Sequence, residues 1–370
     1  MKIFTIPTKF LLPAILFSFT LLFNNCQNNK QQALGSEDEI IVIADSSEYL
    51  ELEGNLQKVF GKVIYTPQPE NLFRLRRGAV KALDTYKGLK NLLIIAPLNS
   101  GTYTSQYIKS ILDSTVTHLV NIDSIYQINR HDLWAQDQFV MILTAPSLDR
   151  LNERLLEDQE NLLYQFRKAS NSRLEKSVYS EKFEQPIIEA QLLQEHGWTI
   201  YVQADYKLAK DAAEDNFVWI RRSPGTDMES WIFVHWIDNA TPEWLHADSV
   251  SAIRNRLSQK FYRTMNDSSF VEIADDYQTN KEIDFKGRYA LMTQGLWRMN
   301  DKSMGGPFIN YIFYDEQTQR IYMVDGSIYA PKYYKKEIIQ QIDVTLHSFL
   351  TEGEITPQRK AYLLDKLKKD

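Results

Sequence analysis

The apolar positions of the chain follow two different periods, which predicts a protein built from both strands and helices. Short β-branched or aromatic runs are typical of strands, whereas apolar residues three and four apart predict amphipathic helices. The runs predict strands at 40–44, 91–96, 139–143, 198–203, 217–221, 231–237, 272–277, 288–293, 308–314 and 320–324. The helical spacing predicts helices at 48–60, 73–83, 104–112, 147–180, 182–196, 249–265 and 333–350.

The run 231–237 is the most informative of the predicted strands. Its alternation places Trp231 and Phe233 on one face and Ile232 and Val234 on the other. Because both faces are apolar, the pattern predicts a strand that is covered on both sides, in the interior of a sheet. The preceding Ser-Pro-Gly-Thr-Asp segment predicts a hairpin with the strand before it.

Together these elements predict an α/β-type fold, α+β in the stricter sense, with mixed or antiparallel sheets flanked by helices. A strand that ends in Ala-Pro and leads into a helix occurs three times, at 96–97, 145–146 and 330–331. Proline is favoured at a helix start, since its missing N–H would be unpaired there. Two interpretations stay open: two related halves joined by a long helical segment, or a common junction used three times.

The same pattern predicts two α/β halves separated by a helical connector. A signal peptide and a polar tether precede them, and a charged tail follows. The predicted boundaries are 1–25 for the signal peptide, 26–38 for the tether, 39–146 for the N-terminal half, 147–197 for the connector, 198–350 for the C-terminal half and 351–370 for the tail.

The N-terminus has the pattern of an exported lipoprotein. Lys2 and Lys9 supply a positive region, and the apolar stretch 10–23 is shorter than the about 20 residues of a membrane-spanning helix. Cys26, the only cysteine, follows where a bacterial lipoprotein carries its lipidated residue, although asparagines replace the usual small residues before it. We expect a palmitate-carrying lipoprotein of the outer membrane that faces the periplasm; ordinary secretion with an unused thiol is the alternative.

The charge balance limits the class of partner. The formal net charge is −6, and removal of residues 1–25, which hold two lysines and no acid, makes it −8. Nucleic-acid binding requires a basic surface, so a nucleic-acid partner is excluded. We therefore expect the lipid on Cys26 to attach the protein to the membrane, with an envelope protein or a glycan as a possible partner.

One cluster has the residue types of a metal site. His235, Asp238 and His246 combine two imidazoles and a carboxylate, but a zinc site needs three or four ligands that converge. His235 falls within a predicted strand among aromatic residues. The prediction is therefore a core histidine beside polar loop residues, with the three side chains only weak candidates for a metal.

A glycine-rich segment offers a candidate ligand turn. Successive glycines can direct backbone N–H groups at an anion, and Gly305 and Gly306 have Arg298 and Lys302 nearby. This arrangement could bind a carboxylate or a phosphate. The alternative, which we favour, is a tight structural turn in which Gly-Gly permits positive φ angles and the following proline sets the exit.

The second half also contains an aromatic face. Trp219, Trp231, Phe233 and Trp236 could bind a sugar or a peptide, but a buried sheet core explains them more simply. No nucleophile elbow, H-E-x-x-H, Walker loop or G-x-G-x-x-G motif occurs, and we expect no cofactor. The sequence therefore leans toward a protein that is not an enzyme, without settling the question.

Several motifs resemble those of one family. The specific ones are Gly-Leu-Trp-Arg-Met at 295–299, Met-Gly-Gly-Pro-Phe at 304–308 and Tyr-Ala-Pro at 329–331, and weaker ones lie at 132–135 and 206–219. Over residues 40–350 the chain resembles the uncharacterised Bacteroidetes lipoproteins catalogued as domain of unknown function 4837. The resemblance implies an exported, lipid-anchored protein of a Gram-negative envelope, and it implies no activity, ligand or catalytic residue.

Three functional hypotheses remain. The leading one is a lipid-anchored cell-envelope protein that acts by binding or scaffolding without catalysis. The second is a periplasmic envelope hydrolase acting on peptidoglycan or glycan, which would need at least two converging carboxylates, or a histidine pair, of shifted pKa in a deep cleft. The third is a binder of a small anionic ligand at the glycine turn, which requires free amides there.

Overall fold

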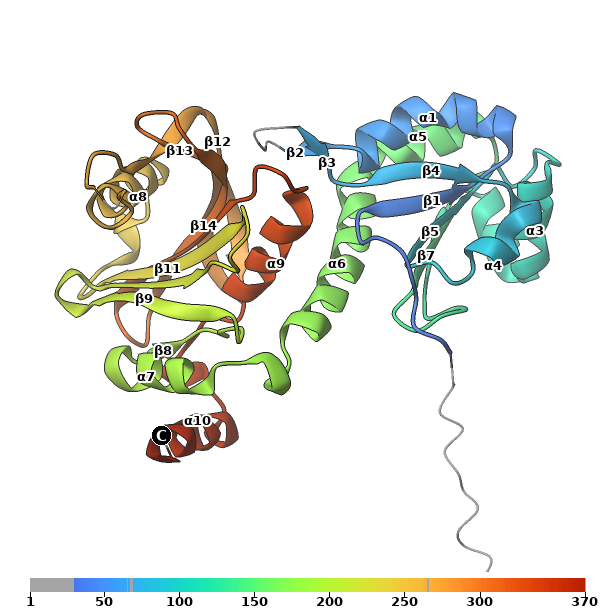
Figure 1. The fold of residues 1–370 in the computed structure, drawn as a ribbon. Helices are drawn as coiled ribbons and strands as arrows, with labels where there is room; N and C mark the ends of the chain where they lie inside the picture. The colour runs from blue at the N-terminus through green and yellow to red at the C-terminus, as the bar shows by residue number, and fades with distance from the viewer. Residues whose placement is uncertain (1–29, 65, 67–68, 265, 370) are drawn as a thin grey trace, which may run out of the picture.

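The computed structural model describes residues 30–64, 66, 69–264 and 266–369, without the side chains of Asp275 and Asp276. Two domains lie side by side, and the long helix α6 (Gln159–Val178) runs between them (Figure 1). The predicted α+β fold is confirmed, since helices flank both a mixed and an antiparallel sheet. The predicted signal peptide and Cys26 lie outside the described residues.

The N-terminal domain is built on a five-stranded sheet with the strand order β4-β1-β5-β7-β6. The first four strands are parallel, and β6 pairs antiparallel with β7 at one edge. The bounds are β1 (Glu39–Ile43), β4 (Arg74–Gly78), β5 (Asn91–Ile95), β6 (Gln127–His131) and β7 (Phe139–Leu143).

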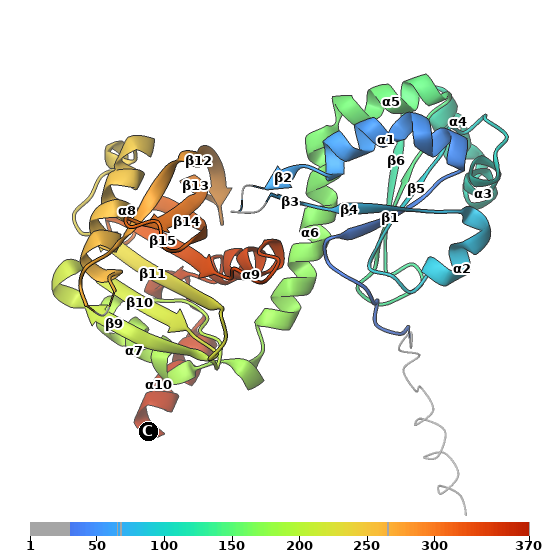
Figure 2. The ribbon, with the colours of Figure 1, turned by 45° about the horizontal axis from the view of Figure 1, so that its top comes forward.

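Helices cover both faces of this sheet, as the two views show (Figures 1 and 2). Alternating strand residues supply the two cores: Val42 packs toward α1, α5 and α6, whereas Ile41 packs toward the opposite helices. The strands are therefore apolar on both sides, as buried parallel strands are. The helices are α1 (Ser46–Phe60), α2 (Leu83–Tyr86), α3 (Tyr103–Ile111), α4 (Ser114–Asn121) and α5 (Leu148–Glu157).

The C-terminal domain is built on a seven-stranded antiparallel sheet with the order β12-β13-β14-β15-β11-β10-β9. The strands are β9 (Tyr206–Ala212), β10 (Phe217–Arg222), β11 (Glu229–Ile237), β12 (Val271–Phe285), β13 (Arg288–Met299), β14 (Gly305–Asp315) and β15 (Arg320–Tyr329). Helix α8 (Ala247–Phe261) contributes to the core on one face, and α7 (Pro186–His196) and α9 (Lys336–Leu346) to the core on the other. Strand β11 lies inside the sheet, as its alternation predicts.

Smaller elements complete the chain. They are the pairs β2 (Val63–Ile64) with β3 (Glu70–Asn71) and β8 (Trp198–Thr199) with β16 (Leu350–Thr351), and short 3₁₀ helices at Val80–Ala82, Glu181–Phe183, Ala213–Asp215, Pro242–Trp244 and Glu352–Glu354. Residues 351–370, which the sequence presents as a charged tail, include helix α10 (Pro357–Lys369), whose Leu363 is buried against α7. Among the described residues, no helix combines the length and the apolar composition of a membrane span.

The two sheets differ in direction and in strand order, so the interpretation of two related halves is not supported. Segment 147–197 is divided between the two domains: α5 and the first part of α6 belong to the N-terminal core, and α7 belongs to the C-terminal domain. The three Ala-Pro segments are therefore better explained as a common junction between a strand and a helix, because proline is favoured near the start of a helix in any fold.

Two predicted helices are corrected. The helix at 73–83 is wrong over its first part, where β4 forms the edge of the sheet and Arg74 and Arg76 pair with Asp38 and Glu39. Charged residues are common on edge strands because they oppose further pairing. The prediction of a single helix at 147–180 is also wrong. Helix α5 ends at Glu157 and α6 begins at Gln159. The carboxylate of Asp158, between them, accepts hydrogen bonds from Tyr126 and Asn161.

The domains contact each other through α9. The Glu70 carboxylate in β3 accepts hydrogen bonds from the backbone N–H groups of Lys335 and Lys336, both at 2.9 Å, at the start of α9. This is a favourable place for a negative charge, since the first N–H groups of a helix lack partners. Farther along α9, the amide of Gln340 donates to Asn171 of α6 at 2.6 Å.

Candidate functional site

An aromatic cavity opens on the α8 side of the C-terminal sheet. Trp219 of β10, Trp231 of β11 and Trp297 of β13 line it, although the sheet places β14 and β15 between the last two. The Trp297 indole crosses β14 and donates to the backbone oxygen of Ile328 in β15, at 3.0 Å. It can do so because Gly306, its partner in β14, has no side chain in the way.

The rings of the cavity form one continuous wall. Ring centroids lie 4.7 Å apart for Trp219 and Tyr262, 5.8 Å for Tyr262 and Trp231, 5.0 Å for Trp231 and Trp297, and 6.3 Å for Trp297 and Tyr329. Two of these pairs are edge-to-face and two are tilted, and aromatic rings prefer such arrangements to a direct face-to-face stack. The wall encloses about 230 Å³, and the remaining lining residues are Arg221, Glu229, Arg263, Thr264, Val271, Met299 and Met304.

Several polar atoms of the cavity wall have no partner. The indole N–H groups of Trp219 and Trp231, the Tyr262 hydroxyl and the Arg221 Nε are buried without a hydrogen bond to any described residue. Each such group costs about 1–3 kcal/mol when it is left unsatisfied. Burial raises the pKa of Tyr262 well above its ordinary value, so its hydroxyl keeps its proton. These atoms have almost no accessible surface, so they lie within the packed wall and are not presented to the cavity.

The charges at the mouth of the cavity are balanced. The Arg221 guanidinium donates to Glu229 at 2.6 Å, and Arg263 pairs with Asp267. Met304 lies at the rim and is 39% exposed, which adds a flexible apolar surface. Since both cations have an acidic partner, the mouth presents donors and acceptors without an excess of either charge.

The predicted aromatic face is confirmed only in part. Trp231 and Phe233 lie on the α8 side with Trp219 packed against them, but Trp236 lies on the other side of the sheet against Trp198. Sequence reasoning missed the contributions of Trp297 and Tyr262, because they come from elements far along the chain. The Leu-Trp motif at 296–297 was the available signal, since a tryptophan beside glycines indicates close packing.

The predicted glycine turn is wrong. Gly305 and Gly306 lie in strand β14 and pair with Arg298 and Trp297 of β13. Arg298 forms an ion pair with Glu272 at 2.9 Å, and Lys302 lies in the connection between the two strands with a φ of +62°. The turn on which a nest of amides depends is therefore absent from this segment.

The weak metal candidates are not brought together. The buried His235 has its Nδ1 2.8 Å from the backbone oxygen of Asn216, and burial lowers its pKa, so the ring is neutral. Asp238 pairs with Arg320 at 2.6 Å. His246 is exposed at the residue before α8. Each side chain thus has a separate structural setting.

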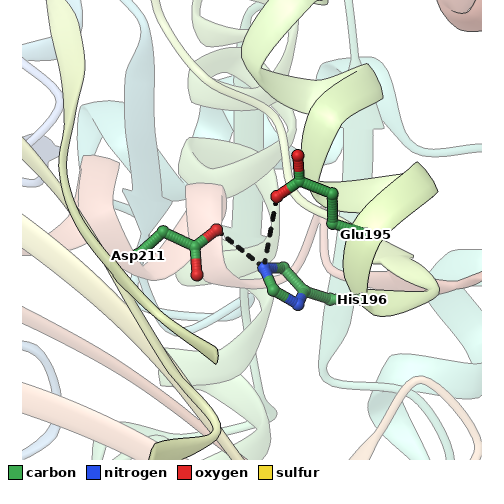
Figure 3. A group of neighbouring side chains, drawn as sticks. All are labelled: Glu195, His196 and Asp211. Carbon is green, nitrogen blue, oxygen red and sulfur yellow. Dashed lines mark hydrogen bonds and ion pairs between the residues drawn. The ribbon is translucent and has the colours of Figure 1, made fainter. Parts of the chain in front are cut away.

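A different histidine does meet two carboxylates, as Figure 3 shows. The Nε2 of His196 lies 2.8 Å from Asp211 and 4.0 Å from Glu195, so both acids approach the same nitrogen. The imidazole ring is 4.9 Å from the ring of Trp236, centroid to centroid. One imidazole and two carboxylates make a partial metal set; their evident effect is to tie the edge strand β9 to the end of α7.

A carboxylate pair of the kind expected for a hydrolase lies between α7 and α10. Burial raises the pKa of Glu189 to about 7, with Arg359 opposing the shift. The Arg359 guanidinium contacts Glu189 at 2.7 Å and Glu184 at 2.8 Å, and the N–H of Val202 donates to Glu189 at 3.0 Å. Because these partners occupy both carboxylates, the pair serves to hold α10 in place.

Another cavity, of about 410 Å³, lies where the parallel strands β1, β5 and β7 end. Ligands often bind at this edge of an α/β sheet. Two polar groups of its lining are paired with each other, since the Thr102 hydroxyl donates to the Glu48 carboxylate at 3.1 Å. The aromatic cavity, which five rings line, is the stronger candidate for a ligand site.

Comparisons with known proteins give family matches and weak structural similarities. No curated protein matches the chain. The Ran-binding protein Mog1p of Saccharomyces cerevisiae is 10% identical, over 42% of this chain and 90% of that one, with a TM-score of 0.29. LpqN of Mycobacterium tuberculosis, described as involved in cell envelope biogenesis, is 8% identical, over 41% of this chain and 81% of that one, with a TM-score of 0.25.

A protein from Bacteroides thetaiotaomicron is similar at 7% identity, over 44% of this chain and 48% of that one, with a TM-score of 0.24. Scores this low carry no argument about function. The family matches divide at the end of α6: residues 33–179 match Domain of unknown function (DUF8532), where the resemblance anticipated one family throughout. Residues 185–348, which include the aromatic cavity, match the family described as Domain of unknown function (DUF4837).

Proposed function

We propose that this is a lipid-anchored protein of the cell envelope that acts by binding a ligand in the aromatic cavity. The observation that carries the proposal is a cavity of about 230 Å³ on one side of the sheet, lined by five aromatic rings and by the paired Arg221 and Glu229. A purely structural core would be close-packed at this place, whereas ligand pockets are open spaces lined mostly by apolar and aromatic side chains. The N-terminal sequence, with Cys26 after a short apolar stretch, supports the location.

The geometry of the acidic residues supports binding over catalysis. A glycan hydrolase uses two carboxylates that face the scissile bond, with one of them able to donate a proton. Glu189 has a suitably raised pKa, but Arg359 contacts both it and Glu184. A substrate would have to displace this arginine and, with it, the packing of α10.

Removal of the Trp231 ring is expected to abolish ligand binding. The mature protein is incubated with the low-mass fraction of an envelope extract, and its melting temperature is measured. A ligand at 100 times its dissociation constant stabilises by about 2.7 kcal/mol, which for a protein of this size is a rise of several degrees. We expect this rise in the wild type and not in Trp231→Ala.

The matched control is Trp244→Ala. Trp244 is 51% exposed and does not line the cavity, so this variant should keep the rise in melting temperature. An equal rise in Trp231→Ala would place the ligand elsewhere. No rise in the wild type would overturn the binding proposal.

Substitution of Cys26 by serine is expected to release the protein from the membrane. Serine cannot take the thioether-linked lipid, so the mature chain would keep no acyl chain to hold it in a bilayer. In the native host, labelling with radioactive palmitate should be lost and the protein should move from the membrane to the soluble fraction. Labelling that survives in Cys26→Ser would show that the anchor is not at this residue.

A further inference from the structure

We propose that His196, Asp211 and Glu195 form a binding site for a divalent transition-metal ion such as Zn²⁺. The site lies at the end of α7, on the face of the C-terminal sheet opposite to the aromatic cavity, so it does not depend on what binds there. Three observations support it: the positions of the ligand atoms, the packing of the imidazole, and the charge of the two carboxylates.

The three side chains bring one nitrogen and two carboxylate oxygens close together (Figure 3). The ligand atoms all lie within 4.8 Å of one another, and the His196 Nε2 lies 2.8 Å from Asp211 and 4.0 Å from Glu195. Zn–N and Zn–O bonds of about 2.0–2.2 Å place the ligands of a tetrahedral ion about 3.3–3.6 Å apart. Because the two measured distances lie on either side of this range, small side-chain rotations are enough to admit an ion.

The imidazole is held in place by its surroundings. His196 is the last residue of α7, and Gly197 ends the helix with a left-handed φ of +75°. Two buried rings lie against the imidazole, with centroid distances of 5.9 Å for Trp198 and 4.9 Å for Trp236. The Glu195 side chain, in contrast, is 59% exposed. The site therefore combines one fixed ligand with one that can turn from solvent toward the ion.

The two carboxylates carry negative charge that no basic side chain balances. In the part of the chain that the structure describes, neither Glu195 nor Asp211 forms an ion pair with a lysine or an arginine. Arg320 donates to the backbone oxygen of His196 at 2.8 Å, but it is paired with Asp238. A metal ion between the two acids would compensate both charges. The C-terminal end of α7 favours it further, because the helix dipole is negative there.

The set of ligands favours Zn²⁺ over Mg²⁺ or Ca²⁺. Imidazole and carboxylate groups are usual zinc ligands, and three protein ligands leave the fourth position to water. Mg²⁺ and Ca²⁺ take six or more oxygen ligands, which three side chains do not supply. Because Asp211 belongs to the edge strand β9 and the other two residues to α7, a bound ion would fasten the edge of the sheet to this helix.

Calorimetric titration of the mature protein with Zn²⁺, after a chelator has removed other metals, tests the site. We expect one tightly bound Zn²⁺ per chain. Glu195→Gln keeps the size of the side chain but removes its charge, and it should weaken zinc binding at least about 10-fold, since even the loss of an outer-shell partner costs about 10- to 100-fold. Because the Glu195 side chain is mostly exposed, the metal-free variant should melt with the wild type.

The matched control is Glu51→Gln. Glu51 is exposed on α1 of the N-terminal domain, so this variant should bind Zn²⁺ as the wild type does. Co²⁺ in place of Zn²⁺ provides a spectroscopic readout, because its visible absorption reports tetrahedral coordination. This absorption should appear in the wild type and in Glu51→Gln, and it should be lost in Asp211→Asn, which keeps a polar side chain of the same size.

Three results would overturn the metal site. They are the absence of zinc binding by the wild type, an unchanged affinity in Glu195→Gln, and binding of Mg²⁺ as tight as that of Zn²⁺. None of them bears on the aromatic cavity, whose test is the Trp231→Ala variant.

Discussion

Replacement of Asp325 by alanine is expected to destabilise the C-terminal domain by about 3–5 kcal/mol, the usual effect of removing one partner from a buried ion pair. Asp325 in β15 and Arg254 in α8 are both fully buried, with the guanidinium Nε 2.7 Å from the carboxylate. Asn310 donates to the same carboxylate at 3.0 Å. Without the Asp325 carboxylate, the Arg254 guanidinium would remain as an uncompensated charge between α8 and the sheet. Urea unfolding followed by circular dichroism measures the loss.

The matched control is Asp215→Ala, which removes the same side chain from the exposed pair with Lys260. Exposed pairs contribute about 0–1 kcal/mol, so this variant should unfold close to the wild type. The double variant Arg254→Met with Asp325→Leu should recover much of the lost stability, because it removes both charges together. Similar unfolding midpoints for Asp325→Ala and Asp215→Ala would contradict the role assigned to the buried pair.

Substitution of Gly306 by alanine is expected to cost about 3 kcal/mol and to disturb the cavity, because overpacking forces the backbone to shift. A Cβ atom at this position would lie 2.0 Å from the backbone oxygen of Ile328, which is also the acceptor of the Trp297 indole. Strands β14 and β15 would have to separate, and Trp297 would lose its hydrogen bond. Thermal unfolding and binding of the envelope extract should both report the change.

The control is the same substitution at Gly54, which we expect to raise the stability of the protein rather than lower it. Gly54 is exposed within α1, and nothing lies within 4 Å of a Cβ atom built there. Alanine favours a helix over glycine by about 1 kcal/mol, so Gly54→Ala should raise the unfolding temperature. If Gly306→Ala were as stable as the wild type, the close approach of the two strands could not explain the glycine.

The sequence pattern was most informative where the structure follows one local period. The alternation of Trp231, Ile232 and Phe233 predicts an interior strand, and β11 is one. The sequence pattern failed to predict the structure where pairing with a neighbouring strand decides the backbone conformation. The Arg-Leu-Arg-Arg-Gly segment at 74–78 has no apolar stripe, and only the carboxylates of Asp38 and Glu39 on the neighbouring strand explain why it is extended.

The candidate site depends on pairings that a single sequence does not reveal. Trp231 and Trp297 are brought together by a strand order in which β15, and not a sequence neighbour, lies beside β11. Gly306 was expected in a turn, because its role as a gap under an indole exists only once β13 and β14 are in register. The tryptophans and tyrosines can be counted from the sequence, but which of them line one cavity cannot.

The contacts of α6 bear on how the two domains came to share one chain. The family matches meet just after this helix, at residues 179 and 185, as though the chain were two exchangeable modules. Yet Ser170 and Asn171 of α6 accept hydrogen bonds from Gln340 of α9, and Glu70 holds the start of α9 from the other side. Exchange of one domain for that of a distant relative would therefore remove hydrogen bonds to which both domains contribute residues. Only domains that have kept matching contact residues could be exchanged without this loss.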